Sequence, residues 1–152
     1  MRRLAESFYS ISITLWVGGV WAIGFIAAPA LFAVLPDRAL AGDLAGKLFG
    51  IIAWVGIVCA AYLLAYFAWR WRRSLPGKGV FWLVLTMLLL VLAGHFGIEP
   101  ILTGLKAEAW PLSVMSDATK SRFVFWHGLA GGLYVLQSLL GAALVLLQDR
   151  GR

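Results

Sequence analysis

The sequence predicts an all-α protein, a four-helix transmembrane bundle that forms one integral membrane domain over residues 1–152. Composition is the first observation behind this fold class, because 62% of the residues are hydrophobic and only 13% are charged. Soluble domains have about half apolar and about a quarter charged residues. Second, four apolar stretches each exceed the roughly 20 residues with which a helix crosses the hydrocarbon core. Third, the charges stand in short clusters between those stretches, so the net charge of +6 does not indicate a nucleic-acid-binding face.

The four spans are expected at about 8–35, 44–69, 80–102 and 123–147. They are apolar nearly all round, so length rather than periodicity identifies them. Pro29 is expected to kink the first span near its end. The side chain of Asp37 is expected to cap a helix that begins near Arg38. The segment between the third and fourth spans, from Thr103 to Ser121, is expected to form a short surface helix or lid, and no internal repeat is evident.

The positions of lysine and arginine predict the orientation of the bundle, because positive charge is retained on the cytoplasmic side. Eight basic residues flank the two termini and the connection between the second and third spans: Arg2, Arg3, Arg70, Arg72, Arg73, Lys78, Arg150 and Arg152. The other five are matched in number by acidic residues: Arg38, Lys47, Lys106, Lys120 and Arg122. We therefore expect a cytoplasmic N-terminus and C-terminus in a bacterial-type inner (plasma) membrane. Lipids are the expected partners, a homo-oligomer or a membrane-protein partner is left open, and no nucleic acid is expected.

Three glycines recur every fourth residue at the start of the second span: Gly42, Gly46 and Gly50. This spacing leaves one helix face without side chains, and we expect another helix to pack closely against it. Asp43 and Lys47 are also four residues apart, so they are expected to pair with each other on the surface of the same helix.

Few ionisable side chains lie within the spans, and each costs about 3 kcal/mol or more unless it is paired or hydrated, so these residues are the first candidates for function. His95 and Glu99 are four residues apart in the third span and share one helix face. His127 lies about one and a half turns into the fourth span. If the last three spans touch, such side chains form one intramembrane polar cluster near the non-cytoplasmic surface. Its candidate members are His95, Glu99, His127, Lys47, Asp43 and Arg122.

Three interpretations of this cluster are open. The side chains can satisfy one another and lock adjacent helices together, as in a component of a membrane complex. They can bind or pass a small solute, an ion or a proton. Alternatively, His95 and His127 can ligate haem or copper in a membrane redox protein, although two histidines on separate helices are a weak ligand set. No nucleophile elbow, zinc signature, phosphate loop or cysteine pair is present, so no catalytic residue is assigned and a non-enzymatic role is expected.

Three stretches carry a resemblance to a known family: LWVGGVWAIGFIAAPALFAVLPDRALAGDLAGKLF, then HFGIEPIL at the end of the third span and RFVFWHGLAGGLYVLQSLLGAALVLL in the fourth. They resemble the bacterial domain-of-unknown-function membrane family that is related to animal transmembrane protein 205. The resemblance covers nearly the whole chain and implies a four-span membrane protein without assigned catalytic residues. A more distant similarity is to four-span copper-resistance and haem-linked protoporphyrinogen oxidase membrane proteins. Those proteins have a histidine early in the first span, where this sequence has Tyr9, Ser10 and Ser12.

Overall fold

The computed structural model describes residues 2–71, 79–108 and 116–151, and all regular structure in these ranges is helical. The elements in chain order are α1 (Arg2–Trp21), η1 (Ala22–Ala27), α2 (Ala28–Val34), α3 (Arg38–Trp71), α4 (Gly79–Leu92), η3 (Ala93–Ile98), α5 (Glu99–Glu108), α6 (Asp117–Leu147) and η4 (Gln148–Gly151). The segments η1 and η3 are π-helical, so α1, η1 and α2 form one continuous rod and α4, η3 and α5 form another.

Within these ranges, four helices are long and apolar enough to cross a membrane: Arg3–Val34, Arg38–Trp71, Gly79–Glu108 and Asp117–Leu147. The predicted all-α fold with four candidate spans is therefore confirmed. Each helix begins before the stretch expected from hydropathy, and the second and third also end after it, because backbone pairing continues past the hydrocarbon core whereas hydropathy marks only the part that lipid covers. The segment expected to form a separate surface helix or lid instead extends two spans where it is described, because residues 103–108 continue α5 and residues 117–121 begin α6; residues 109–115 lie outside the described residues.

Side chains cap the first turns of α3 and α6. Oδ1 of Asp37 accepts hydrogen bonds from the backbone N–H groups of Ala39 (2.8 Å) and Leu40 (3.2 Å). The hydroxyl of Ser116 accepts one from the N–H of Thr119 at 3.2 Å. Such bonds satisfy N–H groups that the first helical turn leaves without partners. The cap predicted at Asp37 is confirmed.

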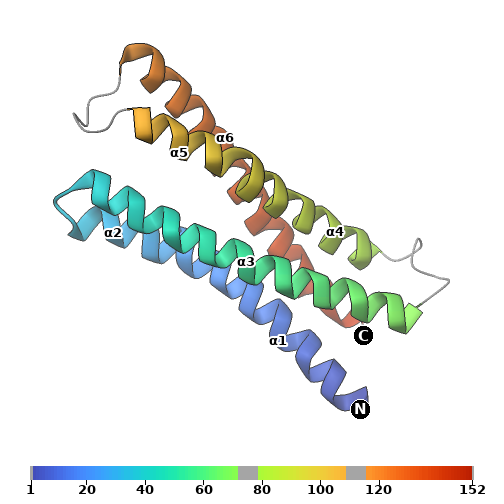
Figure 1. Ribbon diagram of the computed structural model, residues 1–152. Helices are drawn as coiled ribbons and strands as arrows, with labels where there is room; N and C mark the ends of the chain where they lie inside the picture. Colours follow the sequence, from blue (N-terminus) through green and yellow to red (C-terminus); the bar gives the residue numbers. More distant parts are fainter. Residues whose placement is uncertain (1, 72–78, 109–115, 152) are drawn as a thin grey trace.

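The rods form two antiparallel hairpins that lie side by side (Figure 1). The first hairpin pairs α1, η1 and α2 with α3, and the second pairs α4, η3 and α5 with α6. Both α1 and α4 pack against α3 and against α6, so α1 and α4 stand at opposite corners of the bundle. Figure 1 shows that the hairpins meet at the end that holds both termini and separate at the other end into the pairs α2–α3 and α5–α6.

The buried core lies in the half where all four rods meet. Its largest fully buried side chains are Trp16, Tyr9, Phe67, Ile13, Leu63, Met87, Leu144 and Val84. Glycines bring neighbouring helices close to these side chains: the indole of Trp16 packs on Gly56, and the side chain of Ile52 packs on Gly19. The core therefore holds the hairpins together near the termini, and fewer contacts join them in the other half.

Hydrogen bonds from aromatic side chains to backbone carbonyls also tie neighbouring helices together. They join Tyr9 to Gln148 (2.8 Å), Trp21 to Ser138 (3.2 Å), Tyr62 to Ala5 (3.0 Å) and Tyr134 to Val20 (2.5 Å). Each bond gives a tyrosine hydroxyl or an indole N–H a partner, which lipid cannot provide.

Both π-helical segments end two residues before a proline, Pro29 after η1 and Pro100 after η3. In each case the N–H of the intervening residue bonds five residues back, from Ala28 to the Ile23 carbonyl and from Glu99 to the Gly94 carbonyl. Proline has no N–H and its ring clashes with the carbonyl four residues earlier, so a widened turn accommodates it. The kink expected at Pro29 is thus a π-helical turn. Its match in the third span is a structural repeat that the sequence alone did not make evident.

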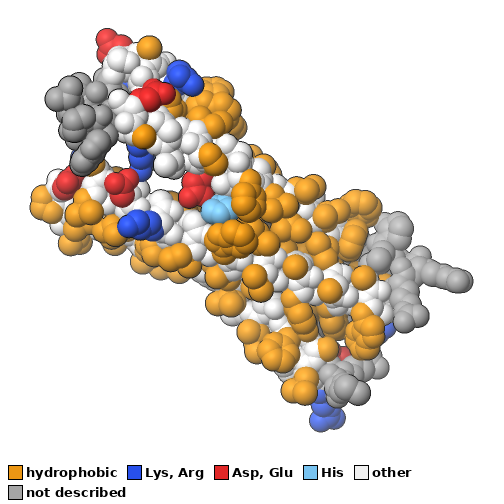
Figure 2. Space-filling model, in the orientation of Figure 1, with side chains coloured by type: hydrophobic (Ala, Val, Ile, Leu, Met, Phe, Trp, Pro, Cys, Tyr) orange, Lys and Arg blue, Asp and Glu red, His pale blue; other side chains and the backbone are white. Residues whose placement is uncertain are grey.

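Large apolar side chains cover the middle of the molecule, and charged side chains gather toward its ends (Figure 2). Those more than half exposed include Phe8, Ile11, Leu15, Trp54, Trp82, Leu89, Val124 and Leu146. Exposure of such an apolar surface to water would be unfavourable, whereas contact with lipid hydrocarbon is favourable. The structure therefore has the surface of a multi-pass membrane protein.

Candidate functional site

His95 lies in η3 and Glu99 begins α5, one turn further along the same rod. Nδ1 of His95 contacts Oε2 of Glu99, although the contact is not directed as a hydrogen bond. The His95 side chain is 14% exposed and that of Glu99 is 46% exposed. The pair thus combines a largely buried imidazole with a carboxylate that solvent or a ligand can reach.

The surface of α3 that faces this pair has an aromatic ring beside His95 and a glycine beside Glu99. The ring of Trp54 meets that of His95 edge to face, with 5.6 Å between centroids. Oε1 of Glu99 lies over Gly50, at 3.6 Å from the place where a Cβ would stand. Glycine at this position leaves the carboxylate uncovered.

An ion pair joins the same two rods further from the termini. Nζ of Lys106 on α5 donates a hydrogen bond to Oδ1 of Asp43 on α3 at 2.9 Å. The expected pairing of Asp43 with Lys47 is therefore wrong, and Lys47 has no ion-pair partner in the part of the chain that the structure describes. A pair four residues apart on one helix gains only a few tenths of a kcal/mol, so the register between the rods decides which partner Asp43 meets.

One antiparallel register between α3 and the third span accounts for three contacts: Trp54 with His95, Gly50 with Glu99, and Asp43 with Lys106. Two helical turns separate Asp43 from Gly50 on α3 and likewise Lys106 from Glu99 on α5, and a further turn on each rod leads to Trp54 and His95. The side chains on each rod therefore share one helix face. We call this set the polar face: Asp43, Gly50, Trp54, His95, Glu99 and Lys106.

The glycine stripe borders the polar face. Gly42 lies under Nζ of Lys106, which is 3.9 Å from its Cβ position, and Gly50 lies under Glu99. No atom of another element lies within 4 Å of the Cβ position of Gly46, which stands between them. In this structure the stripe makes room for polar side chains of α5.

His127 makes no ring contact or ion pair with His95. Its ring stacks on that of Phe123 on the same helix, with centroids 5.6 Å apart and planes 11° apart, and its side chain is exposed. It shares a face of α6 with Tyr134, seven residues further on, which packs against α1. His127 is therefore directed toward the space between the separated hairpins. Figure 2 shows charged side chains around a gap at this end.

The remaining predicted cluster members, Lys47 and Arg122, are exposed. Lys47 stands on α3 between Asp43 and Gly50, beside the polar face, and Arg122 lies near the start of α6. The structure thus brings His95, Glu99 and Asp43 onto one face. It leaves His127, Lys47 and Arg122 nearby without ion pairs to described residues.

The described residues give no support to a haem or copper centre. Among them, no group of three or more His, Cys, Asp or Glu side chains is placed to share a metal ion. Nδ1 of His95 faces Glu99, and its ring packs against Trp54 and Phe96. His127 stands on another helix and has no contact with His95.

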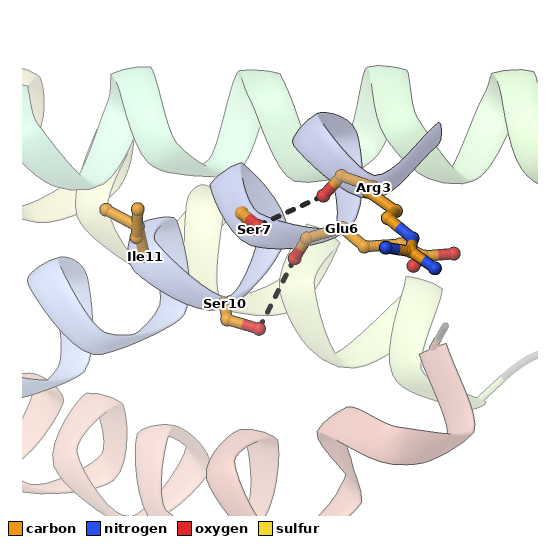
Figure 3. Close-up of a pocket in the computed structure, with 5 residues that line it drawn as sticks. All are labelled: Arg3, Glu6, Ser7, Ser10 and Ile11. Carbon is orange, nitrogen blue, oxygen red and sulfur yellow. Dashed lines mark hydrogen bonds between the residues drawn. The ribbon is translucent and has the colours of Figure 1, made fainter. Parts of the chain in front are cut away.

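A hollow of about 520 Å³ lies on α1 near the N-terminus (Figure 3), at the end of the molecule opposite to the one where the hairpins separate (Figure 1). It is lined by Arg3, Glu6, Ser7, Ser10 and Ile11. The Ser7 hydroxyl donates to the Arg3 carbonyl (3.0 Å) and that of Ser10 to the Glu6 carbonyl (3.4 Å), so α1 itself uses both hydroxyls. These lining residues share one helix, so among the described residues no second helix contributes a side chain to the hollow.

Four long apolar helices and an apolar exterior place the molecule among multi-pass membrane proteins. The chain belongs to the family described as "Domain of unknown function (DUF4149)", whose model matches residues 11–111, or 101 of the 152 residues. The expected membership of a domain-of-unknown-function family is confirmed. No curated protein and no solved structure matches the chain.

Sequence reasoning identified the His95–Glu99 pair from its spacing but missed Lys106, Trp54 and the π-helical turn beneath the pair. The sequence contained two signals that could have identified Lys106 and the π-helical turn. Lys106 stands seven residues after Glu99 and so shares its face, and Pro100 stands five residues after His95, where it disturbs the helix. Trp54 gave no comparable signal, because its contact with His95 depends on the register between two rods.

Proposed function

We propose that this protein resides in a bacterial-type inner membrane, with both termini and the connection between α3 and α4 in the cytoplasm. The support is the excess of basic residues, eight at those three places against five that are matched by acidic residues elsewhere. Green fluorescent protein fused to the C-terminus is expected to fluoresce, and alkaline phosphatase fused at the same point to be inactive, because the phosphatase needs an oxidising compartment. An active phosphatase with a dark fluorescent fusion would contradict this orientation.

Within this topology, we propose that the protein binds a small polar solute or ion at the polar face between the hairpins. The observation that carries the proposal is the His95–Glu99 pair. An ionisable group in a membrane span costs about 3 kcal/mol or more unless it is paired or hydrated. A pair that served only to lock helices together would gain most if both groups were buried and fully hydrogen-bonded. Glu99 instead keeps a half-exposed carboxylate, with no hydrogen-bond donor to it among the described residues.

The surroundings of Glu99 also support a binding role. Gly50 covers none of the carboxylate, and the space over Gly46 is open to at least 4 Å. The Asp43–Lys106 pair lies beyond this space and is itself exposed, with 62% and 38% of the two side chains accessible. A solute would therefore meet acidic and basic groups as it approached Glu99.

Ligand-induced stabilisation tests the proposal. Purified protein in lipid nanodiscs would be heated with a thiol-reactive dye that reports exposure of Cys59, the single cysteine, which is 5% exposed when folded. The probes are sodium, potassium and ammonium chloride, sodium phosphate and glycine, each compared with choline chloride at equal ionic strength. A ligand at 100 times its Kd stabilises by about 2.7 kcal/mol. We expect at least one probe to raise the Tm of the wild type but not of Glu99→Gln.

Glu108→Gln is the matched control, since Glu108 is a carboxylate on the same helix that accepts a hydrogen bond from Thr119 (3.4 Å) outside the polar face. This variant should respond as the wild type does. The site is wrongly assigned if no probe stabilises the wild type, or if Glu99→Gln responds as strongly as Glu108→Gln.

We further propose that the family extends to the animal transmembrane protein 205 proteins, on the basis of the WVGG, APALF and PDRALAG stretches. The structure of an animal member should then contain a π-helical turn before a proline in both its first and third spans. A different helix arrangement would contradict the relationship.

A further inference from the structure

The π-helical turn η3 leaves the His95 carbonyl without a helical partner. In an α-helix this oxygen would accept from the N–H of Glu99, and in a π-helix from the N–H of the next residue. The N–H of Glu99 bonds to the Gly94 carbonyl instead, and the next residue, Pro100, has no N–H. No described side chain donates a hydrogen bond to this oxygen. Among the described residues the His95 carbonyl therefore has no donor, and it is an acceptor inside a candidate membrane span.

The Glu99 carboxylate lies over the same turn. Side chains of a helix lean toward its N-terminus, so that of Glu99 extends back over the turn that contains the His95 carbonyl. Oε2 of Glu99 contacts Nδ1 of His95 on that turn. A backbone carbonyl and a carboxylate, two kinds of oxygen donor, therefore belong to the same helical turn, and Gly50, which faces Glu99, adds no side chain there.

The first span provides an internal comparison. There the Gly24 carbonyl loses the same two donors, because the N–H of Ala28 bonds to Ile23 and Pro29 has none. The ring of Tyr134 packs on Gly24 and fills the space beside this turn. Ala28 occupies the place that corresponds to Glu99, so the first span has no carboxylate there.

We propose that the His95 carbonyl and the Glu99 carboxylate bind an alkali-metal cation. The inference rests on the proposed function and names its ligand. Oxygen donors suit hard cations, and carbonyls freed by irregular helices bind Na⁺ in membrane transporters. One carboxylate balances one positive charge, so a monovalent ion leaves the site neutral whereas a divalent ion would leave an unpaired charge in a medium of low dielectric constant.

Equilibrium binding of radioactive ²²Na⁺ to the protein in nanodiscs tests this site. The wild type is expected to show one saturable site that NaCl competes and choline chloride does not. Glu99→Gln should weaken binding at least tenfold. Pro100→Ala supplies an N–H that can pair with the helix carbonyls and should also weaken binding at least tenfold, although it removes no charge. Pro29→Ala makes the same change in the first span and should bind within twofold of the wild type.

A second measurement examines the carbonyl without altering the turn. Histidine carrying ¹³C at its carbonyl carbon, incorporated into a His127→Ala background, labels His95 alone, because the chain has two histidines. Its infrared band should shift when NaCl replaces choline chloride. An unshifted band, or Pro100→Ala binding as tightly as Pro29→Ala, overturns the role of the carbonyl.

Failure of this inference can be separated from failure of the proposed function. If ²²Na⁺ shows no saturable binding while glycine, phosphate or ammonium still stabilises the wild type but not Glu99→Gln, the cation site is wrong and the solute site stands. If no probe distinguishes Glu99→Gln from Glu108→Gln and ²²Na⁺ does not bind, both are wrong.

Discussion

Replacing Gly56 by alanine is expected to destabilise the bundle where α1 crosses α3. Trp16 is fully buried and its indole packs directly on Gly56. A Cβ added there would overlap Nε1 of the ring and would lie 3.1 Å from both Cδ1 and Cε2. The indole is a rigid group enclosed by core side chains, so it cannot move aside without displacing them.

Overpacking of this kind costs about 1–3 kcal/mol. Replacing glycine by alanine within a helix also gains about 1 kcal/mol of helix propensity, which obscures the packing cost in a single variant. Gly46→Ala is the matched control, because it lies on the same helix and its Cβ would meet no other element within 4 Å. The gain in propensity is common to both variants. Their free energies of unfolding should therefore differ by about 1–3 kcal/mol, with Gly56→Ala the less stable.

The assay is titration with a denaturing detergent, in which unfolding is followed by the rate at which Cys59 reacts with a thiol reagent. Cys59 is buried in the core and is the single cysteine of the chain, so no further label is needed. Equal stability of Gly56→Ala and Gly46→Ala would show that Trp16 does not pack on Gly56, and the register between α1 and α3 would then be wrong.

Three further substitutions test separate contacts. Tyr134→Phe removes the hydrogen bond to the Val20 carbonyl and should cost about 1 kcal/mol in the same titration, and an unchanged midpoint would mean that the bond is absent. Asp37→Ala removes the cap of α3 and should cost about 1 kcal/mol, with faster amide hydrogen exchange in its first turn; unaltered exchange would contradict the cap. Lys106→Met breaks the exposed ion pair with Asp43, which contributes less than about 1 kcal/mol, yet spin labels on the two hairpins should move apart. An identical distance distribution would show that the ion pair does not join the hairpins.

The four helices and the cap at Asp37 followed from the sequence because both depend on local properties. A span needs length and apolar composition, and a cap needs an acceptor side chain directly before the first turn. The contact between His95 and Glu99 followed for the same reason, since residues four apart on a helix are neighbours.

The contacts between the hairpins could not be predicted from sequence, because they depend on how the rods pack in the core near the termini. Asp43 meets Lys106 rather than Lys47 because of a register between α3 and the third span, which no local pattern encodes. His127 does not contact His95, although both belong to the second hairpin, because His95 packs against Trp54 on α3 whereas His127 shares the face of α6 that Tyr134 directs toward α1. The prolines were visible in the sequence, but the choice between a kink and a π-helical turn depends on the packing around each of them.

Glu99 is expected to lie in a space between the hairpins that water reaches from the non-cytoplasmic side. The most direct measurement is labelling of Glu99→Cys, in a Cys59→Ala background, by a membrane-impermeant methanethiosulfonate added to spheroplasts. The thiol should react from outside within minutes, whereas that of Leu63→Cys, at a fully buried core position, should not. An unreactive thiol at position 99, or one that reacts only in inverted vesicles, would contradict the proposed site and its orientation.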